Sequence, residues 1–200
     1  IGGVLYFGWK RDYKTALKLL IIGLLIVSLV SSWWMVSGQE NGVSTDTKTL
    51  LIPSKIVTVT EASEGIGGEV SMVPEEVTMV LNLVSMLVVA SLVIVLVTIF
   101  TQNRFKKINI LLSIVGVVLI FVAVFVFHFG ISQLAEVSVG EFMGSGKLDV
   151  SIPGSGTVSA DSSWGPGLGF IMGVLSLVLL VFVSVFDKLK NFYLKKTSSK

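Results

Sequence analysis

The sequence predicts an all-α transmembrane four-helix bundle with a small extracellular antiparallel β-sheet formed by its two outer loops. Three observations lead to this fold class. Four apolar runs have the length of membrane-spanning helices, the segments between them alternate in charge, and the two long loops contain strand-like alternation of polar and apolar residues. Hydrophobic residues make up 52% of the chain, as expected when four spans fill much of it.

Each apolar run is long enough for a spanning helix, which needs about 20 apolar residues to cross a hydrocarbon core about 30 Å thick. The predicted spans are residues 16–36, 77–100, 108–130 and 166–186. A buried helix of a soluble protein shows a polar face, whereas Ser113 is the only polar break between residues 111 and 127 of the third run. We therefore expect these helices to be surrounded by lipid.

The charged residues predict the orientation in the membrane. Twelve of the fifteen Lys and Arg residues lie before or at the start of the first run, between the second and third runs, and after the last run. The other two loops hold eleven of the thirteen acidic residues. By the positive-inside rule, residues 1–15, 101–107 and 187–200 are cytoplasmic, and residues 37–76 and 131–165 are extracellular. The apolar start of residues 1–15 also suits the inner membrane interface.

Both extracellular loops show strand patterns. In the second loop, residues 147–152 and 157–160 alternate around a turn rich in Pro and Gly, which predicts a hairpin. In the first loop, residues 50–60 are rich in β-branched side chains, and Pro53 marks an edge or a bulge. Residues 69–73 predict a further strand. Isolated hairpins are marginally stable, so we expect these strands to join in one sheet with one face on the helix ends.

No residue pattern indicates catalysis. The chain has no cysteine, which excludes thiolate catalysis, cysteine-bound metal centres and disulfide bonds. It has no Gly-rich phosphate loop and no HExxH, GxSxG or paired-carboxylate motif. We therefore expect a protein that is not an enzyme, with no catalytic residue, cofactor, metal site or small-molecule substrate. A nucleic-acid partner is not expected either, because no folded basic domain is present.

Tryptophans mark the predicted outer ends of two helices. Trp33 and Trp34 fall at the end of the first span, and Trp164 falls at the start of the fourth. Indole rings concentrate at headgroup depth, so these residues fit an interface belt. The alternative is that the rings pack under the extracellular sheet.

Glycines at four-residue spacing predict a helix-packing face. Gly165, Gly169 and Gly173 would stack on one side of the fourth helix and let another backbone approach closely. We favour packing within the bundle over packing against another subunit.

Polar residues inside the predicted spans are few. The main ones include Asn82 and His128, and none of them is a carboxylate. We expect His128, near the outer end of the third span, to have an interfacial structural role, the alternative being a metal or haem ligand. Lys18 lies near the inner boundary, where its amine can extend to the headgroups.

Two segments resemble a known superfamily. Residues 31–37 (SSWWMVS) are similar to the Trp-containing exit of the first helix in the claudin and peripheral-myelin-protein tetraspan superfamily. Residues 163–170 (SWGPGLGF) resemble the aromatic and glycine entry to its fourth helix. The resemblance implies cytoplasmic termini and a strand-rich first extracellular loop. The Gly-Leu-Trp motif and cysteine pair of that loop are absent, so a junction-forming role is not implied.

These observations predict a non-enzymatic integral membrane protein of structural or auxiliary type. We expect lateral association of its helices and an acidic extracellular sheet that contacts a partner or an envelope layer. The expected partners are the lipid bilayer and other membrane subunits or further copies of the chain. Two alternatives remain: an accessory subunit of a respiratory or transport complex, with His128 or Asn82 lining a cofactor or ion path, and an oligomeric pore lined by Thr78, Asn82 and Ser85.

Overall fold

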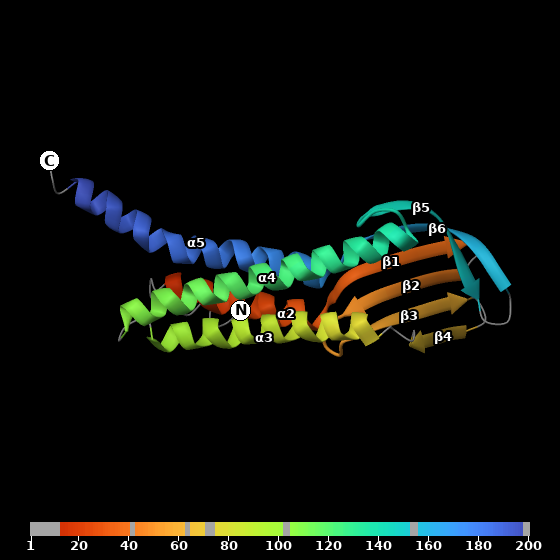
Figure 1. Cartoon of the computed structure of the whole chain (residues 1–200), viewed down its shortest axis with the longest axis horizontal. Coiled ribbons are helices and arrows are strands. Elements are labelled where there is room, and N and C mark those ends of the chain that lie inside the picture. The colour runs from red at the N-terminus through yellow and green to blue at the C-terminus, as the bar shows by residue number, and fades with distance from the viewer. Residues whose placement is uncertain are drawn as a thin grey trace. The chain divides into compact units, whose positions relative to one another are not determined.

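The computed structural model describes residues 13–40, 43–62, 65–70, 75–101, 105–152 and 156–197. Figure 1 shows the helices and strands of these residues in chain order. Contacts between residues divide the chain into two compact units. The first unit comprises residues 1–27, 86–123 and 172–200, and the second comprises residues 28–85 and 124–171.

Four helices of the described residues are long and apolar enough to cross a bilayer, in agreement with the four predicted spans. They are α2 (Tyr13–Val30), α3 (Glu75–Thr101), α4 (Lys106–Ser138) and α5 (Leu168–Thr197). Large apolar side chains on their surfaces, such as Phe121 and Phe125, are more than half exposed. A helix surface of this kind suits lipid and not water.

The second unit contains one antiparallel sheet of six strands. They are β1 (Ser32–Glu40), β2 (Val43–Leu50), β3 (Lys55–Ala62), β4 (Gly65–Val70), β5 (Gly144–Ile152) and β6 (Gly156–Pro166). Their order across the sheet is β4-β3-β2-β1-β6-β5. The strands of both long loops therefore form a single sheet, as predicted, because β1 pairs with β6 (Figure 1).

Three helices end at residues other than those predicted. The first span is predicted to end at residue 36, but α2 ends at Val30 and β1 begins at Ser32. Hydropathy does not separate the two elements here, because the strand continues the apolar run of the helix. The third span is predicted to end at residue 130, whereas α4 continues to Ser138 with more polar residues. In the same way, α5 extends past residue 186 into the predicted tail.

The predicted hairpin in the second loop is confirmed. Residues 147–152 and 157–160 lie within β5 and β6, which pair from Gly144 opposite Trp164 onward. The predicted strand at residues 69–73 overlaps the end of β4, and its remaining residues lie outside the described part of the chain.

Residues 50–60 are a turn and a strand, not the single strand predicted. Residues 51–54 form the turn that joins β2 to β3. Pro53 therefore marks a turn, where its missing N–H costs no ladder hydrogen bond, and not an edge or a bulge. Most of β1 and β2 is not predicted, because their polar and small residues give no regular apolar alternation.

Small residues let three helices of the first unit pack closely. A Cβ added to Gly116 of α4 would lie 3.4 Å from Leu180 Cδ2 of α5 and 3.5 Å from Ile94 Cγ2 of α3. Ser91 Oγ of α3 donates a hydrogen bond of 3.1 Å to the Gly116 carbonyl oxygen. Small residues serve in this way between membrane helices, where close backbone approach replaces the hydrophobic drive.

Two helices connect to the paired strands β1 and β6 with one residue between helix and strand. Ser31 separates α2 from β1, and Gly167 separates β6 from α5. The Gly167 N–H donates to the Trp33 carbonyl oxygen at 2.9 Å, which extends the β1–β6 ladder to the start of α5. A side chain at position 167 would overlap the Ser32 carbonyl oxygen, so glycine is required for this approach.

Trp33 fills the core beside these two connections. Its side chain is fully buried, and Nε1 donates to the Ser28 carbonyl oxygen at 2.7 Å. The ring meets Phe127 of α4 and Phe170 of α5 edge to face, with centroid distances of 4.8 and 5.7 Å. Truncating a buried aromatic side chain to alanine typically costs about 3–5 kcal/mol, so Trp33 is a major part of this core.

Gly169→Ala is expected to destabilise the protein, because an added Cβ would lie 2.6 Å from both the Ser31 carbonyl oxygen and Trp33 Cδ1. Overpacking costs roughly 1–3 kcal/mol, so the thermal unfolding midpoint in detergent should fall. Gly23→Ala is the matched control: nothing lies within 4 Å of its added Cβ, and alanine is the better helix former. Equal midpoints for the two variants would contradict the close packing at Gly169.

Candidate functional site

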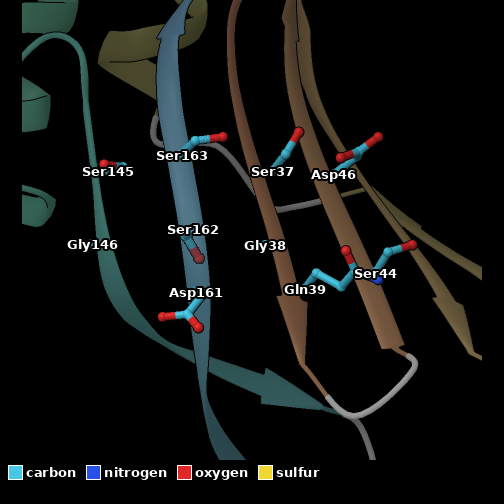
Figure 2. Close-up of a pocket in the computed structure, with 10 residues that line it drawn as sticks. All are labelled: Ser37, Gly38, Gln39, Ser44, Asp46, Ser145, Gly146, Asp161, Ser162 and Ser163. Carbon is cyan, nitrogen blue, oxygen red and sulfur yellow. The ribbon is translucent and has the colours of Figure 1, made fainter.

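A polar hollow of about 610 Å³ lies on the sheet, across β5, β6, β1 and β2. Its volume falls within the range of about 300–1,000 Å³ that small-ligand sites occupy. Figure 2 shows the residues that line it, all of them Ser, Gly, Asp or Gln. They are Ser37, Gly38, Gln39, Ser44, Asp46, Ser145, Gly146, Asp161, Ser162 and Ser163. These ten residues define what we call the polar hollow.

The strand register places most of these side chains in two rows on one face. Residues that stand opposite each other in adjacent strands point to the same side of the sheet. The first row runs Ser145, Ser163, Ser37 and Asp46, and the second runs Lys147, Asp161, Gln39 and Ser44. Figure 2 shows the first row and, from the second row, Asp161, Gln39 and Ser44, with β5 and β6 on one side of the hollow and β1 and β2 on the other.

Each carboxylate of the polar hollow has a lysine beside it. Lys48 Nζ lies 3.6 Å from Asp46 Oδ2, and both side chains are partly exposed. Lys147 stands directly opposite Asp161 in the β5–β6 register. The face is therefore close to neutral at the hollow, although the two loops as a whole are acidic.

The chain itself uses little of the hydrogen-bonding capacity of the polar hollow. Ser162 is buried, and its Oγ donates to the Ala160 carbonyl oxygen at 3.1 Å. Six other lining side chains have no hydrogen bond to protein within the described ranges: Ser37, Gln39, Ser44, Ser145, Asp161 and Ser163. These hydroxyl, amide and carboxylate groups are available to water or to a ligand.

The two carboxylates are not placed for joint chemistry. Asp46 and Asp161 stand two strands and two residues apart, so strand spacing puts their Cα atoms about 12 Å apart. Ligands of one Ca²⁺ ion approach it to about 2.3–2.6 Å, and glycosidase carboxyl groups lie about 5–9.5 Å apart. Among the described residues, no group of three or more His, Cys, Asp or Glu could hold a metal ion. The arrangement favours hydrogen bonding to a ligand.

Two tryptophans tie the segment before β5 to the centre of the sheet. This segment contains Gly140, whose φ of 94° suits glycine and turns the chain away from α4. Trp34 Nε1 of β1 donates to the Phe142 carbonyl oxygen at 2.9 Å. Trp164 Nε1 of β6 donates to the Glu141 carbonyl oxygen, also at 2.9 Å. The start of an edge strand is thereby held in register.

Glycines in β5 make room for the Trp164 ring. A Cβ on Gly144 would lie 3.1 Å from Trp164 Cζ2, and a Cβ on Gly146 would lie 3.5 Å from Cη2. Ser145 alternates with these glycines and therefore points to the opposite face, toward the polar hollow. The two faces of β5 thus have separate roles, one in packing and one in lining the hollow.

The interface-belt prediction is wrong for Trp33, because its side chain is fully buried in protein. Its ring packs in the core of the second unit, as in the alternative interpretation. Trp34 and Trp164 lie in β1 and β6, and not at helix ends. Both donate their indole N–H groups to protein carbonyls.

The predicted glycine face is not one helical face. Gly165 lies in β6, whereas Gly169 and Gly173 lie in α5. The spacing crosses a boundary between a strand and a helix, which spacing alone does not reveal. Gly169 packs against Ser31 and Trp33, so packing within the chain is confirmed for this glycine. Gly173 is buried as well.

His128 and Asn82 are not part of the polar hollow. The His128 ring on α4 meets Phe142 edge to face at a centroid distance of 4.5 Å and lies 6.4 Å from Phe170. These contacts support the structural role expected for His128. Asn82 lies on α3 with an exposed side chain. A cofactor or ion path along these residues stays a prediction.

A hydrogen-bonded cluster in the first unit is not predicted from the sequence. Lys18 is 3% exposed, and its Nζ donates to the Thr98 carbonyl oxygen at 3.0 Å, so it does not extend to the headgroups. Asn109 Nδ2 donates to the same oxygen at 2.6 Å and to Thr101 Oγ1 at 3.2 Å. The last carbonyls of a helix lack intrahelical partners, so these side chains cap the end of α3.

No protein-family model and no curated protein sequence matches the chain. The resemblance to the tetraspan superfamily therefore stays an interpretation, and the function has to be argued from the geometry.

Lys18→Met and Asn109→Leu are expected to act non-additively, because both side chains donate to the Thr98 carbonyl oxygen. Either single variant leaves one donor in place, whereas the double variant removes both. Groups within one network typically show coupling energies of about 0.5–3 kcal/mol. The measurement is the free energy of unfolding of the wild type, both single variants and the double variant in mixed micelles. Simple additivity would contradict the shared acceptor.

Proposed function

We propose that this chain is a non-enzymatic integral membrane protein, structural or auxiliary in type, whose sheet contacts a partner or an envelope layer outside the cell. The observation that carries the proposal is the polar hollow, where six of the lining side chains form no hydrogen bond to the described part of the chain. Unused polar groups gathered in one concave area are typical of a binding surface.

The proposed orientation places the sheet outside and both termini in the cytoplasm. Its support is the distribution of charge: three of the fifteen Lys and Arg residues lie in the two loops that form the sheet. The remaining twelve lie before residue 19, at positions 104–107 and after residue 187, and the positive-inside rule assigns segments rich in Lys and Arg to the cytoplasm.

The connections at Ser31 and Gly167 support a role in binding. Because β1 and β6 join their helices with one residue each, the two strands that form the middle of the hollow have no flexible linkers. A surface held in this way loses little conformational freedom when a ligand binds.

Lateral association of the helices remains part of the proposal, on a basis other than the glycines. Gly169 already packs against Ser31 and Trp33 of the same chain, so it does not offer a contact to another subunit. Phe125 and Phe129 on α4 stack with a centroid distance of 6.2 Å, and both rings are more than half exposed. We assign this surface to lipid and to neighbouring membrane subunits.

Single-cysteine variants test the orientation, since the natural chain has no cysteine. Ser44→Cys places a thiol in the polar hollow, and Lys107→Cys places one at the start of α4. In intact cells, a membrane-impermeant maleimide is expected to label position 44 alone. Position 107 should react only after the membrane is permeabilised. The reverse pattern would contradict an extracellular sheet.

Ser44→Cys also tests the contact surface, when a benzophenone photocrosslinker is attached to its thiol. Thr45→Cys is the matched control, because the next residue of β2 points to the other face of the sheet. Illumination of intact cells should give an adduct from position 44 and little from position 45. A discrete mass increase indicates a protein partner, and a heterogeneous increase indicates an envelope polymer. No adduct from position 44, or equal adducts from both, would contradict the proposal.

A further inference from the structure

The side chains that line the polar hollow carry hydrogen-bonding groups, and glycines complete the lining. Its serine hydroxyls both donate and accept, its glutamine amide does both, and its carboxylates accept. None of the ten lining residues has an aliphatic or aromatic side chain. A ligand with many hydroxyl groups matches these side chains better than a lipid tail or a hydrophobic peptide anchor does.

The charges disfavour a strongly ionic ligand. Asp46 already has Lys48 at 3.6 Å, and Asp161 stands opposite Lys147. A cationic peptide would compete with these lysines for the carboxylates, and a polyanion would meet the carboxylates as well as the lysines. A neutral ligand with hydroxyl donors leaves the Lys48–Asp46 pair intact and still hydrogen-bonds to the carboxylate oxygens.

The hollow exists because small side chains occupy strand positions that favour large ones. β-Branched and aromatic residues are preferred in strands, and the other face of β2 carries threonines at positions 45, 47 and 49. Four serines stand on the hollow face instead: Ser37, Ser44, Ser145 and Ser163. Departures from local preference that packing does not explain are expected at functional sites.

Packing explains the glycines but not these serines. A Cβ on Gly38 would lie 2.8 Å from Ser162 Oγ, and Gly146 lies beside the Trp164 ring. By contrast, Ser37, Ser145 and Ser163 form no side-chain hydrogen bond in the part of the chain that the structure describes. Their hydroxyls are placed for a ligand.

We propose that the polar hollow binds a neutral polysaccharide of the cell envelope. Sugar hydroxyls donate to the carboxylates of Asp46 and Asp161 at opposite corners, and they exchange hydrogen bonds with Ser37 and Ser163 between them. The open, shallow form of the site suits a segment of a long chain. This inference rests on the proposed function and deepens it, because it names the envelope layer as the partner and a saccharide as the group recognised.

The test uses the full chain in lipid nanodiscs and linear neutral hexasaccharides of glucose, mannose and N-acetylglucosamine, with binding followed by saturation-transfer NMR. The variant Ser37→Val/Ser163→Val removes two hydroxyls while strand preference is kept. The matched control, Thr45→Val, removes one hydroxyl on the other face. We expect binding of at least one hexasaccharide, an affinity about tenfold lower for the serine variant, and an unchanged affinity for the control.

Three results would overturn the inference. The first is that the wild-type chain binds none of the hexasaccharides, and the second is that the serine variant binds them as well as the control. The third is that hexalysine binds in their place and is lost in Asp46→Asn, which would assign the hollow to a basic peptide. Unfolding midpoints of all variants show that each is folded.

The proposed function can survive the failure of this inference. A discrete protein adduct from position 44 with no saccharide binding would leave a contact surface in place and remove the polysaccharide. A cytoplasmic position for the sheet in the labelling experiment would remove the proposed function, and with it an envelope source for the ligand.

Discussion

The direct connection of two helices to two paired strands is the constraint on which the second unit depends. β1 follows α2 after Ser31, α5 follows β6 after Gly167, and β1 and β6 are hydrogen-bonded neighbours. The end of one helix and the start of another are therefore brought together by the sheet. Trp33 fills the core at this point, and Gly169 is needed because atoms of the α2–β1 connection lie within 2.9 Å of any Cβ there.

The polar hollow follows from the same pairing. Because β1 and β6 are the middle two of the four strands that line the hollow, their side chains form the middle of both polar rows, and β2 and β5 contribute the ends. The two faces of these strands have different roles. On one face, Trp34 and Trp164 hold the segment before β5 through their indole N–H groups. On the other face, small polar side chains line the concave surface of the polar hollow.

The sequence predicts the parts of this structure that depend on local properties. Four helices and the β5–β6 hairpin follow from hydropathy and alternation, which are read within a few residues. The start of β1 is missed because Trp33 continues an apolar run whether it faces lipid or a protein core. The glycine spacing misleads because Gly165 and Gly169 lie on two sides of a strand–helix boundary. The polar hollow depends on pairing between strands that are distant in the sequence, and the hydrogen bonds to the Thr98 carbonyl oxygen join three helices. No local sequence pattern predicts contacts of this kind.

Hydrogen exchange at the Gly167 amide tests the central claim most directly. Its N–H donates to the Trp33 carbonyl oxygen, and this bond exists only if the β1–β6 ladder reaches the start of α5. In detergent micelles at constant pH, the amide should be protected as strongly as amides in the middle of β6, since it opens only with the sheet. Exchange at the rate of an unbonded glycine would show that Gly167 belongs to a flexible linker, and it would contradict the direct connection of the β1–β6 ladder to α5.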